Sequence, residues 1–462
     1  MNHHRRRIYV ASAALLACLL LGGIFSWAML QNRFTSRIAA VKARGEPLTY
    51  AELGAIYPHP PADQDTTDLL IQAGEALAAS AKDAAWRPLP FISEGREPPQ
   101  VGQPWAELAL AEKFLTDNAT SVRQLHEAAA LGCLARFPGV TTPDAVGAVL
   151  NYASPLRCAA RVLRLESNVR AHSGDAQGAI EAVTAGLTLQ RSLANEPLII
   201  SQLVRLAMFG SAAHELKSTL GSIPYSDDAL ARVHDILAGI DFHRGLRPAF
   251  MGERVFGLAT LENISSAHPR ATNILMKITS APDKSRYLDV VNDYLDATEK
   301  PWPDMLSDST LIELKYQGNN SHWHVLSGGI GPTFMAAINA VSRAELVRRL
   351  ALVAVAVEQY HHRHGVYPAD LAQLVPEFLS EVPLDPTDGQ SFHYRTENGS
   401  YDLYSTTDAF PLPSGESVDL TTGANPSFLF RMPSRRNHPL PNNPIKKSAA
   451  DRHTKTWAAD GH

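Results

Sequence analysis

Cysteine and net charge are both scarce in this sequence, and each shortage excludes a class of protein. Three of the 462 residues are cysteine, and none is spaced from another as zinc ligands are, which argues against a cysteine metal site. Cys133 and Cys158 either pair in an oxidising compartment or lie in separate helices as small buried thiols, and we favour the second arrangement. The formal net charge of −5 gives no basic field for nucleic acid and no strong acidic field for cationic partners.

Local catalytic signatures are missing as well. The glycines between Gly328 and Gly331 follow no hydrophobic strand and precede no Lys-Ser/Thr pair, so they form neither a phosphate-binding loop nor a dinucleotide-binding turn. The His-Glu pairs at His126 and His214 lack the second histidine of a zinc protease, and the hydrolase pattern Gly-x-Ser-x-Gly does not occur. The sequence therefore names no reaction and favours a protein that is not an enzyme, although residues scattered over several helices could form a site without a local motif.

Two groups of polar residues nevertheless invite a site. Glu253 and Glu262 lie nine residues apart, about 13–14 Å along a straight helix, which is too far for a catalytic pair. With Arg254 between them, we expect salt bridges within a helix instead. His361 and His364 are spaced to share a zinc ion, but the end of a solvated helix favours imidazolium without any metal. We prefer the structural interpretation for both groups.

A single long apolar run decides the compartment. Three arginines, Arg5 to Arg7, precede an uncharged segment at residues 8–30, which is long enough to cross about 30 Å of hydrocarbon. The run is longer than that of a signal peptide and ends without a clear cleavage site, so we expect an uncleaved anchor, with lipidation of Cys18 as the alternative. Residues 1–36 are thus predicted to be a cytoplasmic stub and transmembrane anchor of an inner-membrane protein with an exported body.

Residues 37–330 are predicted to be a helical body, because proline and glycine cluster between segments rich in alanine and leucine. The clearest pair of helices meets at Gly174-Asp175, and with Ala179 and Gly186 it resembles a tetratricopeptide-type hairpin. Stacked helices of this kind form grooves that bind peptides or partner helices. The expected helices are Tyr50–Ile56, Thr66–Ala79, Trp105–Leu115, Ser121–Arg136, Pro155–His172, Asp175–Leu193 and Pro197–Leu220, followed by further helix over Ser226–Ser307.

A polar, glycine-containing stretch from Asp308 to Thr333 is predicted to be a loop that ends the helical body. A small α+β domain is then expected at residues 331–425. Apolar residues recur at three- and four-residue intervals over Ala344–His364 and predict an amphipathic helix that Gly365 ends.

The residues that follow this helix predict turns and strands. Pro368 fixes the start of a short helix, and Pro383–Asp388 forms a rigid turn that Gly389 closes. Residues on both sides of Asn398-Gly399 alternate in polarity, which is typical of two strands joined by a tight hairpin. The sequence therefore predicts a helix laid across a small antiparallel sheet.

This domain resembles the periplasmic domain of the major pseudopilins of type II secretion. The shared features are the helix ending in Tyr360, then His364-Gly365-Val366-Tyr367-Pro368, Leu371, Leu374, the turn Val382–Pro386, Phe392-His393-Tyr394 and Tyr401–Ser405. They cover less than a fifth of the chain, and they imply a fold rather than an activity. The whole layout is similar to that of membrane-anchored bacterial envelope proteins, which likewise implies no reaction.

The resemblance also implies a calcium site, because pseudopilins hold calcium in the loop after the Tyr-Ser strand. The corresponding loop offers Asp408 and Asp419, with Ser405 and Ser417 as further oxygen donors. Calcium takes six to eight oxygen ligands, so an ordinary turn-rich loop remains the alternative.

The end of the chain, residues 426–462, is expected to be a disordered basic tail. Its cationic residues are Arg431, Arg435, Arg436, Lys446, Lys447, Arg452 and Lys455. Taken together, the patterns predict a non-catalytic, membrane-anchored envelope protein for protein interaction or assembly. The alternatives are an accessory of a type II secretion or pilus-like system and an envelope enzyme of unknown reaction.

Overall fold

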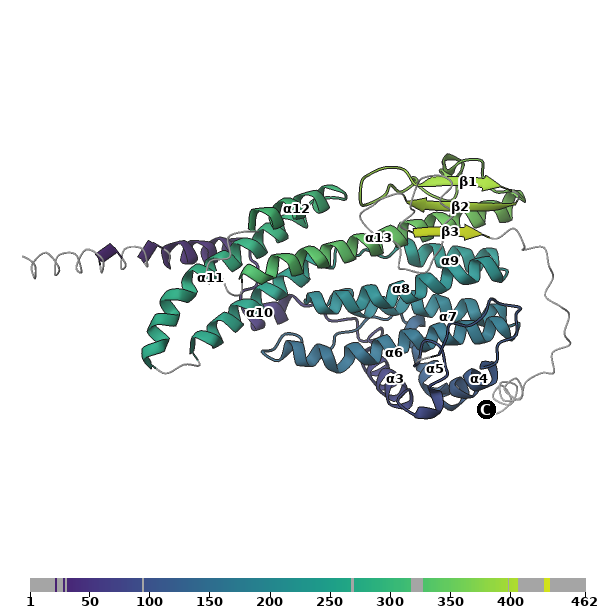
Figure 1. Cartoon of the computed structure of the whole chain (residues 1–462), viewed down its shortest axis with the longest axis horizontal. Helices are drawn as coiled ribbons and strands as arrows, with labels where there is room; N and C mark the ends of the chain where they lie inside the picture. The colour runs from purple at the N-terminus through teal and green to yellow at the C-terminus, as the bar shows by residue number, and fades with distance from the viewer. Residues whose placement is uncertain are drawn as a thin grey trace, which may run out of the picture.

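The computed structural model describes residues 21–22, 28–29, 31–93, 95–266, 270–316, 327–397, 399–405 and 428–432. The protein is mainly helical and carries a small antiparallel sheet, as the sequence predicts (Figure 1). Within these residues no helix combines the length and the apolar character needed to cross a lipid bilayer. Most of the predicted anchor, residues 8–30, lies outside the described part of the chain.

The helices and strands of the described residues follow one another along the chain in a fixed order. They are α2 (Tyr50–Ile56), α3 (Thr67–Ser80), η1 (Ala84–Trp86), α4 (Leu108–Asp117), α5 (Ala119–Ala130), α6 (Ala145–His172), α7 (Ala176–Leu189), η2 (Gln190–Leu193), α8 (Ile199–Ser222), α9 (Asp227–Ala238), α10 (Leu246–Ser266), α11 (Arg270–Ala297), α12 (Asp304–Tyr316), α13 (Ser327–His364), η3 (Leu371–Leu374), β1 (His393–Glu397), β2 (Ser400–Ser405) and β3 (Phe428–Met432). Residues 31–43 are also helical.

Helix α6 is central to the N-terminal half, where it packs against α3, α7 and α8. It ends at the predicted hairpin: Gly174 takes a φ of +82°, and the Asp175 carboxylate accepts a hydrogen bond from the Gly178 backbone N–H at 2.9 Å, which caps α7. Gly186 then allows α7 to approach α8, because a Cβ there would lie 3.3 Å from that of Ala212. Local turn chemistry and small residues therefore set this part of the bundle.

Helix α13 runs from α11 and α12 to the sheet. It packs against α8, α9, α11 and α12 and reaches β2 and β3 (Figure 1). Its apolar residues belong to a buried cluster that extends continuously from α7 to Leu403 in β2, so the core continues across residue 330. The three strands lie in the order β1-β2-β3, and both pairs are antiparallel.

The turns predicted around the sheet are confirmed. Gly365, Gly389 and Gly399 have φ values of +74°, +75° and +72°, conformations that favour glycine. The buried Asp385 carboxylate accepts hydrogen bonds from the backbone N–H of Thr387 at 2.8 Å and from the Ser405 hydroxyl. The Asp385 side chain thus ties the turn at Pro383–Asp388 to the end of β2.

The expected loop over Asp308–Thr333 is wrong at both ends. Helix α12 continues to Tyr316 and α13 begins at Ser327, so the four residues Gly328–Gly331 lie in a helix and are not a linker. Tertiary contacts override the low helix propensity of glycine here: the buried Tyr294 hydroxyl donates to the Gly331 carbonyl at 3.2 Å.

Three other expectations need correction. Helix α6 begins at Ala145, ten residues before Pro155, which the helix carries in its interior, and α5 ends at Ala130 because Gly132 turns the chain with a φ of +88°. The segment Phe428–Met432 is a strand paired with β2, although it falls in the expected disordered tail. The basic residues of this region obscure a short apolar run in the sequence. In the structure this run pairs with the otherwise open edge of β2.

The contact between α10 and the start of α8 gives a test of the packing. Gly252 carries no side chain, and a Cβ there would lie 1.5 Å from the Pro197 carbonyl oxygen. We expect Gly252→Ala to lower the free energy of unfolding by about 1–3 kcal/mol, because backbone must move to admit the methyl group. Gly210→Ala is the matched control: a Cβ there meets nothing within 4 Å, so the better helix former should stabilise by about 0.5–1 kcal/mol. Urea denaturation followed by tryptophan fluorescence measures both, and equal effects would contradict this packing.

Candidate functional site

A groove of about 620 Å³ lies between α6 and α8 and is lined by arginines on one side. Arg157, Arg161 and Arg164 follow one another at intervals of four and three residues, so they share one face of α6. Opposite them, α8 presents residues at similar intervals, among them Gly210 and His214. Gly210 leaves open space where a side chain would otherwise reach into the groove.

Arg164 is held in place from three directions. Its guanidinium lies 3.5 Å from the Glu215 carboxylate and 3.2 Å from that of Glu97, and it sits over the ring of Phe91 at 3.9 Å from the centroid. Phe91 has a φ of +65°, a left-handed conformation that costs a non-glycine residue about 1–3 kcal/mol. The loop that precedes α4 therefore stores strain where its aromatic ring supports this arginine.

Glu215 is the buried support of the groove. Its carboxylate accepts hydrogen bonds from the Ser167 hydroxyl at 2.9 Å and from the Asn168 side-chain amide at 2.7 Å. Burial raises the pKa of this carboxyl, whereas Arg164 and the two donors act in the opposite direction. The ion pair with Arg164 therefore fixes the last of the three arginines from the buried side of the groove.

The other two arginines remain available to a ligand. Arg157 and Arg161 are exposed, and within the described residues neither forms an ion pair with a carboxylate. Guanidinium groups bind carboxylates and phosphates through paired N–H donors. The groove thus has the chemistry of an anion-binding surface, with one arginine fixed in advance and two that can close on a ligand.

A second polar cluster is sealed inside the bundle around Glu196, which is fully buried. The Tyr152 hydroxyl donates to its carboxylate at 2.8 Å and the Ser201 hydroxyl at 3.3 Å, and the Tyr57 hydroxyl donates to the other oxygen. Burial raises the pKa of Glu196 to about 7, against the effect of these donors. This carboxyl lines none of the described cavities, so its position suits a structural role.

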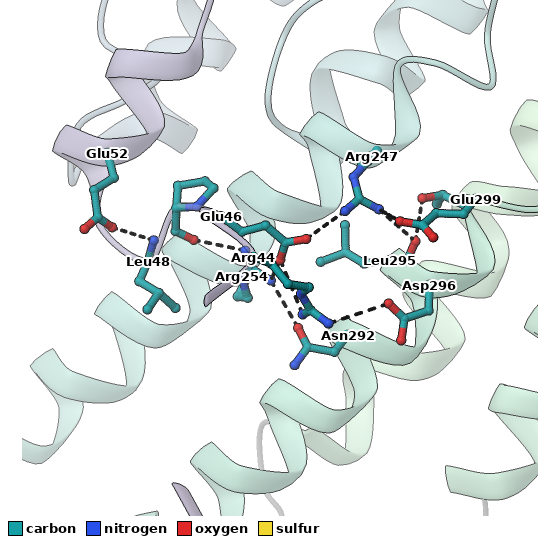
Figure 2. A network of polar contacts seen from close by, with 12 residues as sticks. Arg44, Glu46, Leu48, Glu52, Arg247, Arg254, Asn292, Leu295, Asp296 and Glu299 are labelled. Carbon is teal, nitrogen blue, oxygen red and sulfur yellow. Dashed lines mark hydrogen bonds and ion pairs between the residues drawn. The ribbon is translucent and has the colours of Figure 1, made fainter. Parts of the chain in front are cut away.

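Arg247 and Arg254 of α10 belong to a network of polar contacts centred on Glu46. Arg254 is fully buried and donates to Glu46 at 2.7 Å and to the Pro47 carbonyl at 3.1 Å. Arg247 donates to the other oxygen of Glu46 at 2.7 Å (Figure 2). The expected salt bridges within the helix are therefore wrong for Arg254, whose partner lies more than two hundred positions earlier in the chain.

The remaining partners of this network extend it to the N-terminal segment and α11. Figure 2 shows that Arg44 also contacts Glu46 and pairs with Asp296. The side-chain carbonyl of Asn292 accepts from Arg254, and the Glu299 carboxylate accepts from Arg247. Glu253 points elsewhere and accepts a hydrogen bond from the Ile199 backbone N–H at 3.1 Å, while burial raises the pKa of its carboxyl. Together these contacts attach the segment that follows the predicted anchor to the rest of the body.

The histidines at the end of α13 do not converge. His361 stacks on Tyr367, with ring centroids 4.2 Å apart, whereas the His362 ring lies 2.9 Å from Asp227 and His364 packs on Tyr360. In the part of the chain that the structure describes, no three metal-ligating side chains come together.

Asp408, Asp419 and Ser417, the proposed calcium ligands, lie outside the described residues. Cys133 and Cys158 are buried free thiols, and burial raises the pKa of each.

Comparison of the chain with models of protein families, with curated protein sequences and with solved structures gave no match.

Proposed function

We propose that the protein is a non-catalytic, membrane-anchored component of the cell envelope that binds an acidic segment of a partner protein in the α6–α8 groove. The observation that carries this proposal is the row Arg157, Arg161 and Arg164, of which two are exposed and unpaired with carboxylates in the described residues. Residues 8–30 would hold the chain in the inner membrane, and the body would lie on the exported side.

The spacing of the arginines favours a segment over a single ion. Intervals of four and three residues along α6 separate the guanidinium stems by about 6 Å and about 4.5 Å of helix rise. One phosphate cannot reach all three, whereas carboxylates at similar intervals on a partner helix can meet them in turn. Exposed Glu97 at the rim of the groove would exchange its contact with Arg164 for one to the incoming carboxylate.

The support beneath the groove also suits binding. Glu215 and Phe91 hold Arg164 before a ligand arrives, and pre-ordering a side chain saves about 0.5–1.5 kcal/mol of entropy on binding. The α6–α7 hairpin, which resembles a tetratricopeptide unit, agrees with a body that presents helical grooves to protein segments. A rigid groove attached to a membrane anchor would hold its partner at the membrane surface.

Charge reversal in the groove tests this proposal. Full-length protein in zwitterionic lipid nanodiscs is titrated against a fluorescein-labelled alanine peptide that carries glutamate at every fourth position. We expect Arg157→Glu combined with Arg161→Glu to weaken binding about tenfold or more, because two charge-assisted contacts become repulsive. Inorganic polyphosphate serves as a competitor to distinguish a phosphate polymer from an acidic protein segment.

The control keeps the same net charge. Arg123 and Arg232 are exposed on α5 and α9, so Arg123→Glu combined with Arg232→Glu should weaken binding less than about twofold in moderate salt. Equal losses in both double variants would reduce the binding to general electrostatic attraction and refute a specific groove. If polyphosphate binds with higher affinity than the peptide, the ligand is a phosphate polymer and not an acidic protein segment.

A second candidate function is an accessory role in a type II secretion or pilus-like system. It is favoured by α13 lying against the three-stranded sheet, with the turn at Asp385 tied to Ser405, which agrees with the arrangement that the pseudopilin resemblance implies. Affinity purification from cross-linked cells should then recover secretion components. If the purified protein has an intact anchor but carries no secretion components, the accessory role is refuted. The proposed binding of an acidic segment would then stand by itself.

A further inference from the structure

A separate cavity of about 390 Å³ lies on the α3 side of α6. Its floor is apolar and fully buried at Leu70, Phe137 and Leu156. The rings of Phe137 and Tyr152 stack with centroids 4.2 Å apart and form one wall, and the hydrogen bond from Tyr152 to Glu196 fixes that wall from behind. The volume and lining suit a small organic ligand.

The mouth of this cavity is acidic. Glu75 of α3 and Asp144, just before α6, are exposed among the lining residues, together with Thr142 and Asn151. No lysine or arginine lines the cavity, and in the described residues neither carboxylate has an ion pair. The Asp144 side chain also makes no capping hydrogen bond to α6. Both carboxylates are therefore available to a cation.

Pro155 adds an acceptor at the same place. It lies inside α6 and has no backbone N–H, so the carbonyl of Asn151 four residues earlier loses its helical donor. Helix α3 approaches closely at this point, because a Cβ on Gly74 would lie 3.0 Å from the Pro155 Cβ. The cavity thus combines an apolar floor with hydrogen-bond acceptors at its mouth. No lysine or arginine among its lining residues neutralises these acceptors.

From this arrangement we propose that the α3–α6 cavity binds an organic cation, a primary ammonium or guanidinium group on an apolar stem. The stem would lie on Phe137 and Leu70, and the cationic head would meet Glu75, Asp144 and the Asn151 carbonyl. A free amine and a lysine or arginine side chain of a peptide share this chemistry. The site is independent of the α6–α8 groove and takes ligands of the opposite charge.

Photoaffinity labelling locates such a ligand without interference from partitioning into lipid. Full-length protein in nanodiscs is irradiated with phenylbutylamine that carries a diazirine, and the labelled peptides are mapped by mass spectrometry. Labels are expected on the peptides that contain Ile71 and Ala148, which line the cavity. Excess unlabelled phenylbutylamine should prevent labelling, whereas phenylbutanol, which has the same stem without the charge, should compete at least about tenfold more weakly.

Variants separate the two parts of the site. Glu75→Gln combined with Asp144→Asn should lower the labelling about tenfold by removing the charge at the mouth, and Ile71→Trp should block the cavity while an unchanged circular dichroism melt verifies folding. Equal competition by phenylbutanol, or labelling that survives both variants, would overturn the proposal. Competition by a short leucine-flanked lysine peptide that exceeds that of phenylbutylamine identifies a protein segment as the source, and the reverse order identifies a free amine.

Discussion

Replacing Glu46 with glutamine is expected to lower the free energy of unfolding by about 3–5 kcal/mol, because the change leaves a buried guanidinium without a counter-charge. Arg254 is fully buried and Glu46 is 8% exposed, and Arg247 and Arg44 also contact this carboxylate. Burial lowers the pKa of Arg254, which reflects the cost of holding its charge away from water. Glu46 is therefore the carboxylate that balances the buried charge of Arg254.

The neighbouring carboxylate of Glu299 provides the matched control. It lies 2.8 Å from Arg247, but its side chain is 63% exposed, so Glu299→Gln should change stability by less than about 1 kcal/mol. Urea denaturation of the full-length protein, followed by tryptophan fluorescence, measures both variants. Similar small losses in the two variants would contradict a buried, essential ion pair.

Local opening gives a second measurement of the same network. Glu46 belongs to the segment that follows the helix at residues 31–43, and Arg37 of that helix pairs with Asp289 of α11. In Glu46→Gln, backbone amides of residues 40–46 should exchange hydrogen faster than in the native protein, because the segment detaches before the core unfolds. The network would thereby link the predicted anchor rigidly to the body.

Local turn chemistry explains which parts of the fold could be predicted from the sequence. The capping box of Thr49 and Glu52 begins α2 where expected, and glycines with positive φ end the helices and turns around Gly174 and Gly365. These features depend on residues close together in the chain. The early start of α6, the glycine-rich start of α13 and strand β3 depend instead on surfaces supplied by distant segments, which the sequence pattern does not reveal.

The candidate sites divide in the same way. The spacing of Arg157, Arg161 and Arg164 is visible in the sequence, but only the fold brings α8 opposite them and Phe91 beneath one of them. Glu196 and its tyrosine donors have no local signal, since Tyr57 lies 139 positions away along the chain. Arginines at helical spacing can therefore be recognised in the sequence as one side of a charged groove. A buried carboxylate such as Glu196 can be found only from the structure.

Stability should also fall as pH rises from about 4.5 to about 7, because of Glu196. The pKa of this carboxyl is raised from its ordinary 4.5 to about 7 by burial, so the folded protein holds a proton there that the unfolded chain has already released. The stabilisation is complete below pH 4.5 and is lost as pH rises through 7. A shift of this size corresponds to about 3 kcal/mol across the window.

The change Glu196→Gln isolates this contribution, because glutamine keeps a hydrogen-bond acceptor for Tyr57 and a donor for Tyr152 without titrating. Denaturation at pH 5 and pH 8 should show a difference smaller by about 3 kcal/mol in this variant than in the native protein. Glu127, exposed on α5, supplies the control, since Glu127→Gln should leave the native difference unchanged. A native pH dependence retained in Glu196→Gln would mean that the buried carboxyl is ionised throughout, and that the two tyrosines and Ser201 together offset the cost of its burial.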